Sequence, residues 1–593
     1  MPTVNAMTFQ FAGAAGTGCD SQGVSWSRSL TRAGLWVFSQ FDFESRIRGG
    51  HIFYHIRVSA DPIHCHTQGT HVLLAFDQFA VTERANDVLP GGAAIFDERY
   101  DIDESVFAGK DVLPLKAPLI EMATEIGGNR VMANTAAVGV LIGLTAFDPK
   151  IIERALWENF TKRYPGSRGE DLAKANVNVL RAAVELGETR AGDFDYELQP
   201  QPGGDDRILL NGNEAFAMGA IAGGCRFAAG YPMTPSSSIL EYMAAHQEDY
   251  GIVFKHTEDE IAGILTAIGA AHVGVRALAA TSGGGFCLMT EGLGLAGMTE
   301  TPVVVVNVQR TGPSTGMPTR TEQGDLEFVI HASHGEFPRI VLAPGSLEEC
   351  FEAGYRSFNL AERYQTPVIV MSDLYQAFAM KSVPRSAIDF EAVEIDRGEL
   401  VSEAELDGWD HDTVYARHKV TDSGISARAL PGHPRSVHMT SGDEHTERGF
   451  ITESSVVRKQ QMDKRMRKEE LARTDDMRPP GRYGAEGAEI TLVGWGSTKG
   501  AIREAVDHLN AMGTSADSLH FADIWPVPDS AKEALESSGR LIAVEQNYVG
   551  QLSNVLRSAT GIDMDERILK YDGHQIGPDD ILRSIEAEVE ARV

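Results

Sequence analysis

The stretch Arg276–Arg310, RALAATSGGGFCLMTEGLGLAGMTETPVVVVNVQR, decides the fold of the central part of the chain. It contains a short apolar run that ends at Thr281, a turn rich in glycine, a helix-length segment and a second apolar run, Pro302–Asn307. This order of strand, turn, helix and strand is typical of a parallel sheet covered by helices. Because similar runs alternate from about Ile208 to Val383, we predict a doubly wound α/β domain there.

The same stretch contains Gly292–Gly297, which matches the GxGxxG pattern of dinucleotide-binding proteins. That pattern binds a pyrophosphate only where its glycines form the turn directly after a strand. Here the turn after the strand is Ser282–Gly285, so Gly292–Gly297 falls late in the following helix. The next strand leads to Gln309 and Arg310, where a ribose-binding enzyme would carry an acid. We therefore predict that these glycines serve close helix packing.

Composition and charge narrow the functional classes. The 593 residues suffice for about three or four domains, and 42% apolar with 23% charged residues is typical of a globular protein. No long apolar run occurs, and the first residues lack a basic segment followed by an apolar one. We thus predict neither a membrane span nor a signal peptide and expect a cytoplasmic protein. The formal net charge of −31 argues against a surface that tracks nucleic-acid phosphates.

The cysteines offer no metal site. They are scattered and never form a CxxC pair, so we expect neither a four-cysteine cluster nor a structural zinc, and we assign no metal ligand to this chain. The one local cluster is His64–His66, with the sequence HCH. We predict a plain strand there, because residues i and i+2 of a strand share a face while the cysteine points away. The five cysteines are Cys19, Cys65, Cys225, Cys287 and Cys350.

Shifts in composition divide the chain into five parts. We predict an N-terminal α/β domain over residues 1–195, a Pro/Gly/Asp-rich linker over 196–207, the doubly wound domain over 208–389, a charged arm over 390–485 and a last α/β domain over 486–593. The arm includes the basic segment VVRKQQMDKRMRKEELAR. We predict a helix that faces solvent or another subunit, in preference to a nucleic-acid patch.

Two motifs of the doubly wound domain suit helix starts. Thr234 and Pro235 suit an N-cap and a first helical position, which leaves free N–H groups where an anion can bind, although a capped helix without a ligand explains them equally well. Thr257 and Glu260 match the T-x-x-E capping box before an apolar helical stripe. The local pattern therefore gives Glu260 a structural explanation and no catalytic role.

A third motif, the turn-rich segment Val308–Arg320, follows a buried strand. Ligands of open α/β sheets bind beyond the carboxyl ends of the strands. Arg310 is placed there to bind a carboxylate with two hydrogen bonds, or to pair with a structural acid.

Five segments, GYPMTPSS, EDEIAGILTAIGAA, ATSGGGF, LMTEGLGLAGMTE and QRTGPSTGMPTRTEQGDL, resemble the α subunit of 2-oxoacid:ferredoxin oxidoreductases. These are thiamine-diphosphate enzymes. The N-terminal GTGCDSQGV and ESRIRGGH resemble the γ domain that some members carry ahead of α, and RALPGHP, SGDEHTERGFITE and VEQNYVGQL fit as well. The resemblance implies a γ-type domain, a pyrimidine-binding domain and a transketolase C-terminal-like domain, in that order.

The resemblance also implies roles for single residues. Glu260 matches the glutamate that hydrogen-bonds N1′ of the cofactor's aminopyrimidine. Thr234 and Arg310 match the residues that hold the carboxylate of the 2-oxo acid. Our candidates for binding a second carboxylate are Arg320 or His256 of this chain, or a lysine of the partner. The residues implied to bind the cofactor are Pro232, Thr234, Glu260, Ser282, Gly283, Gly284 and Phe286.

Two sequence patterns of thiamine enzymes with an iron–sulfur cluster do not occur: a GDG followed by an Asn, and cluster cysteines. The resemblance thus implies a β partner that brings the diphosphate site, Mg²⁺ and a [4Fe-4S] cluster, in an (αβ)₂ assembly. Coenzyme A is the implied co-substrate, which the γ-type domain is expected to cover or bind. Because ferredoxins are acidic, we expect ferredoxin to dock on the partner and not on this acidic chain.

We therefore predict oxidative decarboxylation of 2-oxoglutarate with coenzyme A to succinyl-CoA, CO2 and reduced ferredoxin. Pyruvate or another 2-oxo acid is the alternative substrate. A non-oxidative thiamine-dependent transferase and a non-catalytic binding subunit are alternatives from other classes.

Overall fold

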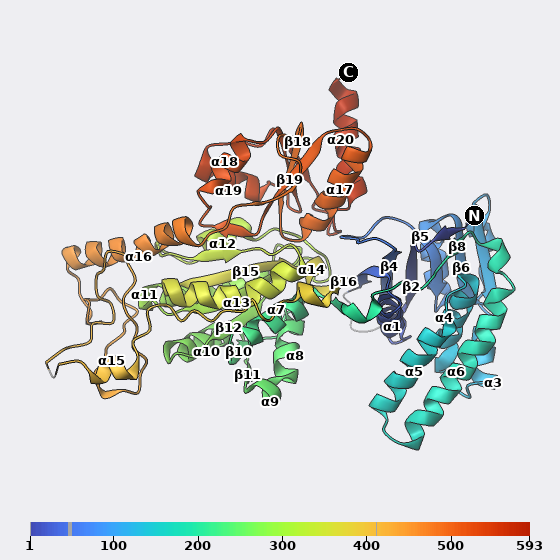
Figure 1. Ribbon diagram of the computed structural model, residues 1–593, viewed down its shortest axis with the longest axis horizontal. Helices are drawn as coiled ribbons and strands as arrows, with labels where there is room; N and C mark the ends of the chain where they lie inside the picture. The colour runs from blue at the N-terminus through green and yellow to red at the C-terminus, as the bar shows by residue number, and fades with distance from the viewer. Residues whose placement is uncertain (1, 45–49, 411, 593) are drawn as a thin grey trace. The chain divides into compact units, whose positions relative to one another are not determined.

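The computed structural model describes residues 2–44, 50–410 and 412–592, and it divides the chain into two compact units (Figure 1). The first unit comprises Met1–Leu210 and Ala379–Ala387, and the second comprises Asn211–Phe378 and Ile388–Val593. The segment Ala379–Ala387 was predicted to belong to the central domain. It belongs to the first unit because its strand β16 (Met380–Pro384) pairs with two strands of the N-terminal sheet. Residues 45–49 of the motif ESRIRGGH lie outside the described residues.

The first unit is built on a mixed sheet with the strand order β7-β6-β5-β2-β4-β3-β16-β9. The central strand β2 runs parallel to β5 and antiparallel to β4. An α/β domain over the N-terminal residues is therefore confirmed. Besides β16, the strands of this sheet are β2 (Met7–Ala14), β3 (Trp36–Phe43), β4 (His51–Ser59), β5 (Thr70–Ala75), β6 (Val88–Asp97), β7 (Val112–Ala117) and β9 (Arg207–Leu210).

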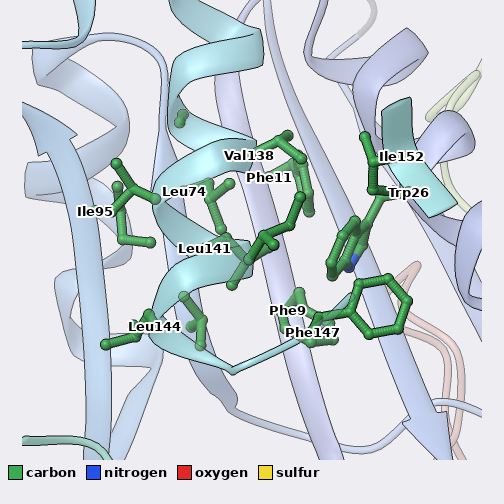
Figure 2. Close-up of a cluster of buried hydrophobic side chains, with 14 of the residues drawn as sticks. Phe9, Phe11, Trp26, Leu74, Ile95, Val138, Leu141, Leu144, Phe147 and Ile152 are labelled. Carbon is green, nitrogen blue, oxygen red and sulfur yellow. The ribbon is translucent and has the colours of Figure 1, made fainter. Parts of the chain in front are cut away.

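Apolar side chains from this sheet and its helices form a large buried core (Figure 2), and a second, smaller cluster includes Leu73 and Phe96. Trp26 of α1 (Cys19–Arg32) packs edge-on against Phe9 and Phe147. Helix α4 (Ala133–Leu144) lies close to α6 (Ser167–Glu188): a Cβ at Gly143 would stand 2.2 Å from the carbonyl oxygen of Val184. Glycine is required there because the two helix backbones touch.

Two local predictions for the first unit are wrong. His64–His66 is irregular and not a strand; there His64 Nδ1 lies 3.2 Å from Lys381 Nζ, on the neighbouring strand β16. The linker 196–207 is partly ordered into strands. Its first residues form β8 (Tyr196–Glu197), which pairs with β1 (Thr3–Val4), and Arg207 begins β9. In the linker, pairing with distant strands decides the backbone, which composition does not reveal.

The second unit contains the predicted doubly wound domain, with the strand order β11-β10-β12-β13-β15-β14-β20. The strands from β11 to β14 are parallel, and the antiparallel edge strand β20 comes from the C-terminal part of the chain. The strands are β10 (Phe227–Gly230), β11 (Val253–His256), β12 (Ala277–Thr281), β13 (Val303–Gln309), β14 (Ile340–Leu342), β15 (Pro367–Asp373) and β20 (Asp523–Trp525). The helices that follow β10, β11, β12 and β13 are α8 (Ser237–Ala245), α10 (Glu260–His272), α11 (Gly283–Thr299) and α12 (Leu326–His331), respectively.

Gly292 and Gly297 lie inside α11, as predicted from their distance to the strand. A Cβ at Gly292 would stand 2.8 Å from Ile264 of α10, and one at Gly297 would stand 2.5 Å from the ring of Phe337. The GxGxxG pattern therefore allows close packing on α10 and on the segment before β14, and the prediction is confirmed.

A C-terminal sheet with the order β17-β19-β18-β21-β22 shares one hydrophobic core with the doubly wound domain. Its strands are β17 (Gly481–Gly484), β18 (Ile490–Trp495), β19 (Ala516–Phe521), β21 (Arg540–Glu545) and β22 (Glu566–Leu569). Among the residues that the structure describes, no helix combines the length and apolar character needed to cross a membrane.

The arm is fixed to the doubly wound domain by buried charges. In α16 (Ser455–Asp475), Lys464 and Lys468 are fully buried and donate to the two carboxylate oxygens of Glu300, which follows α11. Although burial alone would raise it, these two lysines hold the pKa of Glu300 well below its usual range. Burial lowers the pKa of Lys468 to about 7. The predicted helix is therefore present, but one of its faces, which was predicted to meet solvent or another subunit, is buried within this chain.

Glu300, His418 and His445 offer ligand atoms within 4.8 Å of one another. His418 Nδ1 lies 3.0 Å from Glu300 Oε1, and burial lowers the pKa of His418 to about 3. Because both oxygens of Glu300 already accept hydrogen bonds from lysines, we interpret this group as an internal ion cluster that holds the arm.

Candidate functional site

The predicted site residues lie at the carboxyl edge of four neighbouring strands. Thr234 follows β10, Glu260 follows β11, Ser282 follows β12 and Arg310 follows β13. The carboxyl ends of parallel strands meet at one edge, where ligands of doubly wound sheets bind. Residues far apart in the sequence are thereby gathered along this edge.

Glu260 is the first residue of α10 and is only 3% exposed. The N-cap is Asp259, whose side chain accepts a hydrogen bond from the Ala262 backbone N–H at 2.8 Å. The predicted capping box of Thr257 and Glu260 is therefore wrong, because the nearer Asp259 caps the helix. Glu260 Oε1 is buried and has no hydrogen-bond partner among the described residues. A buried carboxylate oxygen without a donor is costly unless a ligand supplies one.

The carboxyl group of Glu260 packs on the first turn of α11. A Cβ at Gly285 would stand 2.5 Å from Glu260 Oε1 and 2.1 Å from Thr281 Oγ1. Within the described parts of the chain, the hydroxyl group of Thr281 has only a long 3.4 Å contact to the Ser282 carbonyl oxygen. A glycine at position 285 thus leaves room for two polar side chains beside each other beneath the helix.

The predicted turn Ser282–Gly285 is the N-cap and first turn of α11. Ser282 makes no side-chain cap bond, and its hydroxyl oxygen is buried without a partner in the described part of the chain. Gly284 is exposed, and a Cβ there would meet only the Ser314 carbonyl oxygen, at 3.9 Å. The N-terminus of α11 therefore offers open backbone at the edge where Glu260 lies.

Two polar residues that the sequence analysis missed lie on the other side of this turn. Asn307, at the end of β13, donates from Nδ2 to Asp325 Oδ2 at 3.1 Å. Burial raises the pKa of Asp325, and a Cβ at Gly283 would stand 2.4 Å from its Oδ2. The sequence contains one signal, Gly324-Asp-Leu, which lacks the second glycine of a GDG motif.

Arg310 and Thr234 are brought together. Arg310 Nη1 donates to the Thr234 carbonyl oxygen at 2.8 Å, and burial lowers the pKa of Arg310. The predicted N-cap at Thr234 with Pro235 as the first helical residue is wrong: α8 begins at Ser237, because the Ser236 backbone N–H closes a turn onto Met233. Thr234 thus belongs to a turn before the helix.

Arg310 and Arg320 stand at the two ends of one closed loop. The Thr311 backbone N–H donates to the Arg320 carbonyl oxygen at 3.0 Å, and Thr311 pairs with Met317 inside the loop. The Arg320 side chain packs on Gly573 of the C-terminal domain, where a Cβ would stand 2.9 Å from Arg320 Cβ. The loop therefore keeps the two arginine backbones close together.

The remaining predicted residues differ in exposure. Pro232 and His256 are exposed; His256 ends β11 beside Gly230 of β10. Phe286 is fully buried in the core and packs edge-on against Phe328. Phe286 therefore supports α11 from inside, and the structure does not place it on the open surface of the site.

The chain matches two protein families and a series of relatives. The family described as "Pyruvate flavodoxin/ferredoxin oxidoreductase, thiamine diP-bdg" matches residues 218–464, and the one described as "Pyruvate ferredoxin/flavodoxin oxidoreductase" matches residues 8–186. A 2-oxoacid:ferredoxin oxidoreductase subunit alpha from Sulfolobus sp. is 32% identical over 97% of this chain and 96% of its own length.

Two further matches name one substrate. The 2-oxoglutarate oxidoreductase subunit KorA of Mycobacterium tuberculosis is 34% identical over 78% of this chain and 69% of its own length. A structure of 2-oxoglutarate:ferredoxin oxidoreductase from Magnetococcus marinus with 2-oxoglutarate, coenzyme A and succinyl-CoA bound is 31% identical, with a TM-score of 0.90. That match covers 99% of this chain and 100% of the other.

Proposed function

The chain belongs to the 2-oxoacid:ferredoxin oxidoreductase family as an α subunit, and from this premise we propose that it forms half of a thiamine-diphosphate site that decarboxylates 2-oxoglutarate oxidatively with coenzyme A. The products are succinyl-CoA, CO2 and reduced ferredoxin. A β partner contributes the diphosphate site, Mg²⁺ and the [4Fe-4S] cluster. The proposal is supported by the residues at the carboxyl edge of the parallel sheet.

The observation that best supports the proposal is Glu260 Oε1, which is buried beside the open first turn of α11 with no donor among the described residues. This fits a ligand that brings its own N–H or protonated ring nitrogen to the carboxyl group, as an aminopyrimidine does. Ser282, with a buried unpartnered hydroxyl in the described part of the chain, offers a second polar contact. Thiamine diphosphate, when bound, supplies the nucleophilic carbon and the electron sink for decarboxylation. Glu260 then holds or releases a proton at Oε1.

Gly285→Ala tests this fit. The added methyl group would overlap Glu260 Oε1 and Thr281 Oγ1, so the carboxyl group must move. Overpacking of this kind costs about 1–3 kcal/mol, and we expect thiamine diphosphate to bind roughly fivefold to 150-fold more weakly. Calorimetric titration of the cofactor-stripped complex with its partner measures this. Gly192→Ala, which meets no atom within 4 Å, is the control. Equal affinity in the two variants would contradict the fit.

The proposed substrate rests on the two arginines of the loop. Arg310 uses one of its five N–H donors for the Thr234 carbonyl oxygen, and a guanidinium group is not deprotonated in proteins. Its remaining donors can bind the carboxylate next to the keto carbon. Arg320, whose backbone is bonded to that of Thr311, is our candidate for the second carboxylate of 2-oxoglutarate. Two relatives whose names contain 2-oxoglutarate support this choice over pyruvate.

Arg320→Ala tests the substrate assignment. Loss of a hydrogen bond to a charged group costs about 1.5–3 kcal/mol. We therefore expect kcat/KM for 2-oxoglutarate to fall roughly tenfold to a hundredfold, while kcat/KM for pyruvate, which lacks a second carboxylate, stays unchanged. Steady-state rates with both acids measure the ratio. An unchanged ratio would remove Arg320 from substrate recognition.

A further inference from the structure

Asp325 stands at the position where an aspartate usually caps its own helix, directly before α12. Its side chain makes no such bond. The carboxyl group lies instead against the neighbouring helix α11, so that a Cβ at Gly283 would be 2.4 Å from Asp325 Oδ2 and 3.1 Å from Oδ1. Capping of α12 therefore does not explain this acid.

The carboxyl group is held from the end of β13. Asn307 Nδ2 donates to Asp325 Oδ2 at 3.1 Å, and the Asp325 backbone N–H donates to Gln309 Oε1 at 3.0 Å. Gln309 is itself fixed, because its Nε2 donates to the Ser372 carbonyl oxygen at 3.1 Å. The preceding Gly324 is held from the C-terminal domain, where Gln551 Nε2 donates to its carbonyl oxygen at 2.7 Å. These hydrogen bonds fix both the backbone and the side chain of Asp325.

The carboxyl group of Asp325 lies against the first turn of α11. The leading N–H groups of a helix carry partial positive charge and need acceptors, and Ser282 gives α11 no side-chain cap. The carboxyl group of Asp325 packs on Gly283, while that of Glu260 packs on Gly285. Two acids therefore lie against the same helical turn, at positions two residues apart.

We propose that Asp325 is a positioning residue for the Glu260 site, whose carboxylate fixes the first turn of α11 and thereby sets the affinity for the aminopyrimidine ring that this turn and Glu260 face. The inference rests on the proposed thiamine-diphosphate function. Asp325 touches neither the substrate nor the reacting atoms. It acts through Gly283, so it governs cofactor binding and leaves the chemical step unchanged.

The test compares Asp325→Asn and Asp325→Ala in the complex with the partner subunit. Asparagine keeps the size and still accepts from Asn307, but it removes the charge; alanine removes both. The matched control is Glu327→Gln, two residues later, where the carboxylate accepts from Asn554 Nδ2 at 3.1 Å. Calorimetric titration with thiamine diphosphate gives the affinity, turnover at saturating cofactor gives kcat, and thermal unfolding reports the fold.

We expect roughly tenfold weaker cofactor binding for Asp325→Asn, the size of a favourable charge–dipole contact, and a larger loss for Asp325→Ala. In both variants kcat at saturating cofactor should be unchanged, and the control Glu327→Gln should behave like wild type. Wild-type affinity in both variants would overturn the inference, and so would a lower kcat with unchanged affinity. If Asp325→Ala does not fold, the isosteric Asp325→Asn decides. A wild-type complex that binds no thiamine diphosphate would overturn the proposed function as well, whereas binding that is indifferent to Asp325 overturns this inference alone.

Discussion

Replacing Glu260 with glutamine will lower turnover of the assembled enzyme by roughly a hundredfold to ten-thousandfold, the contribution of a positioned proton-transfer group. Glutamine fills the same buried space at the start of α10 and still offers an amide oxygen. It cannot exchange a proton with the bound ring at the position of Oε1. The expected loss is therefore in kcat, with little change in the free energy of unfolding.

The measurement is 2-oxo-acid-dependent reduction of a viologen dye by the complex, at saturating cofactor. Glu258→Gln is the matched control, because Glu258 is exposed and carries the same charge two residues before. Equal turnover in the two variants would exclude a proton-transfer role for Glu260 and would favour the alternative of a non-catalytic binding subunit.

Replacing Glu300 with glutamine will destabilise the attachment of the arm by roughly 3–5 kcal/mol, the usual cost of breaking a buried ion pair by removing one partner. Glutamine leaves Lys464 and Lys468 buried without a counter-charge. The sign of the pH dependence follows from the lowered pKa of Glu300. A carboxyl group with a lowered folded-state pKa stabilises the fold above its usual pKa, and that stability is lost as pH falls through the folded value.

Limited proteolysis within residues 390–475 and thermal unfolding of the complex measure this effect. Glu470→Gln is the control in the same helix, because Glu470 pairs only with the neighbouring Arg473 in an exposed contact among the interactions described. We expect rapid cleavage of the arm in Glu300→Gln and a wild-type pattern in the control. Identical patterns in the two variants would contradict the view that buried charges anchor the arm.

The sequence predicts a feature well where neighbouring residues determine it, and poorly where the folded backbone or distant residues determine it. The position of Gly292–Gly297 inside a helix was predictable, because strand and helix periods are set by neighbouring residues. The helix starts were less predictable, since Asp259 and Thr257 compete for one cap and only the folded backbone decides. The same holds for Thr234, where a turn onto Met233 delays the helix until Ser237.

Interactions between distant residues escaped the sequence analysis. Glu300 lies 164 residues from Lys464, so the basic segment was predicted to face solvent or another subunit and not a buried acid. Asp325 and Gly283 are likewise far apart in the sequence, and only packing shows that the acid lies on the glycine turn. The family resemblance supplied candidates such as Glu260 and Arg310, whereas Thr281, Asn307 and Asp325 required the coordinates.

The most direct test of the central claim is anaerobic viologen reduction by this chain co-expressed with its β partner, with 2-oxoglutarate, pyruvate and a branched-chain 2-oxo acid compared in parallel. We predict activity that depends on coenzyme A and on thiamine diphosphate, with 2-oxoglutarate preferred. Activity with pyruvate alone would contradict the substrate assignment and keep the mechanism. A complex loaded with cluster and cofactor that oxidises none of the three acids would contradict the account of the Glu260 site as half of an active site.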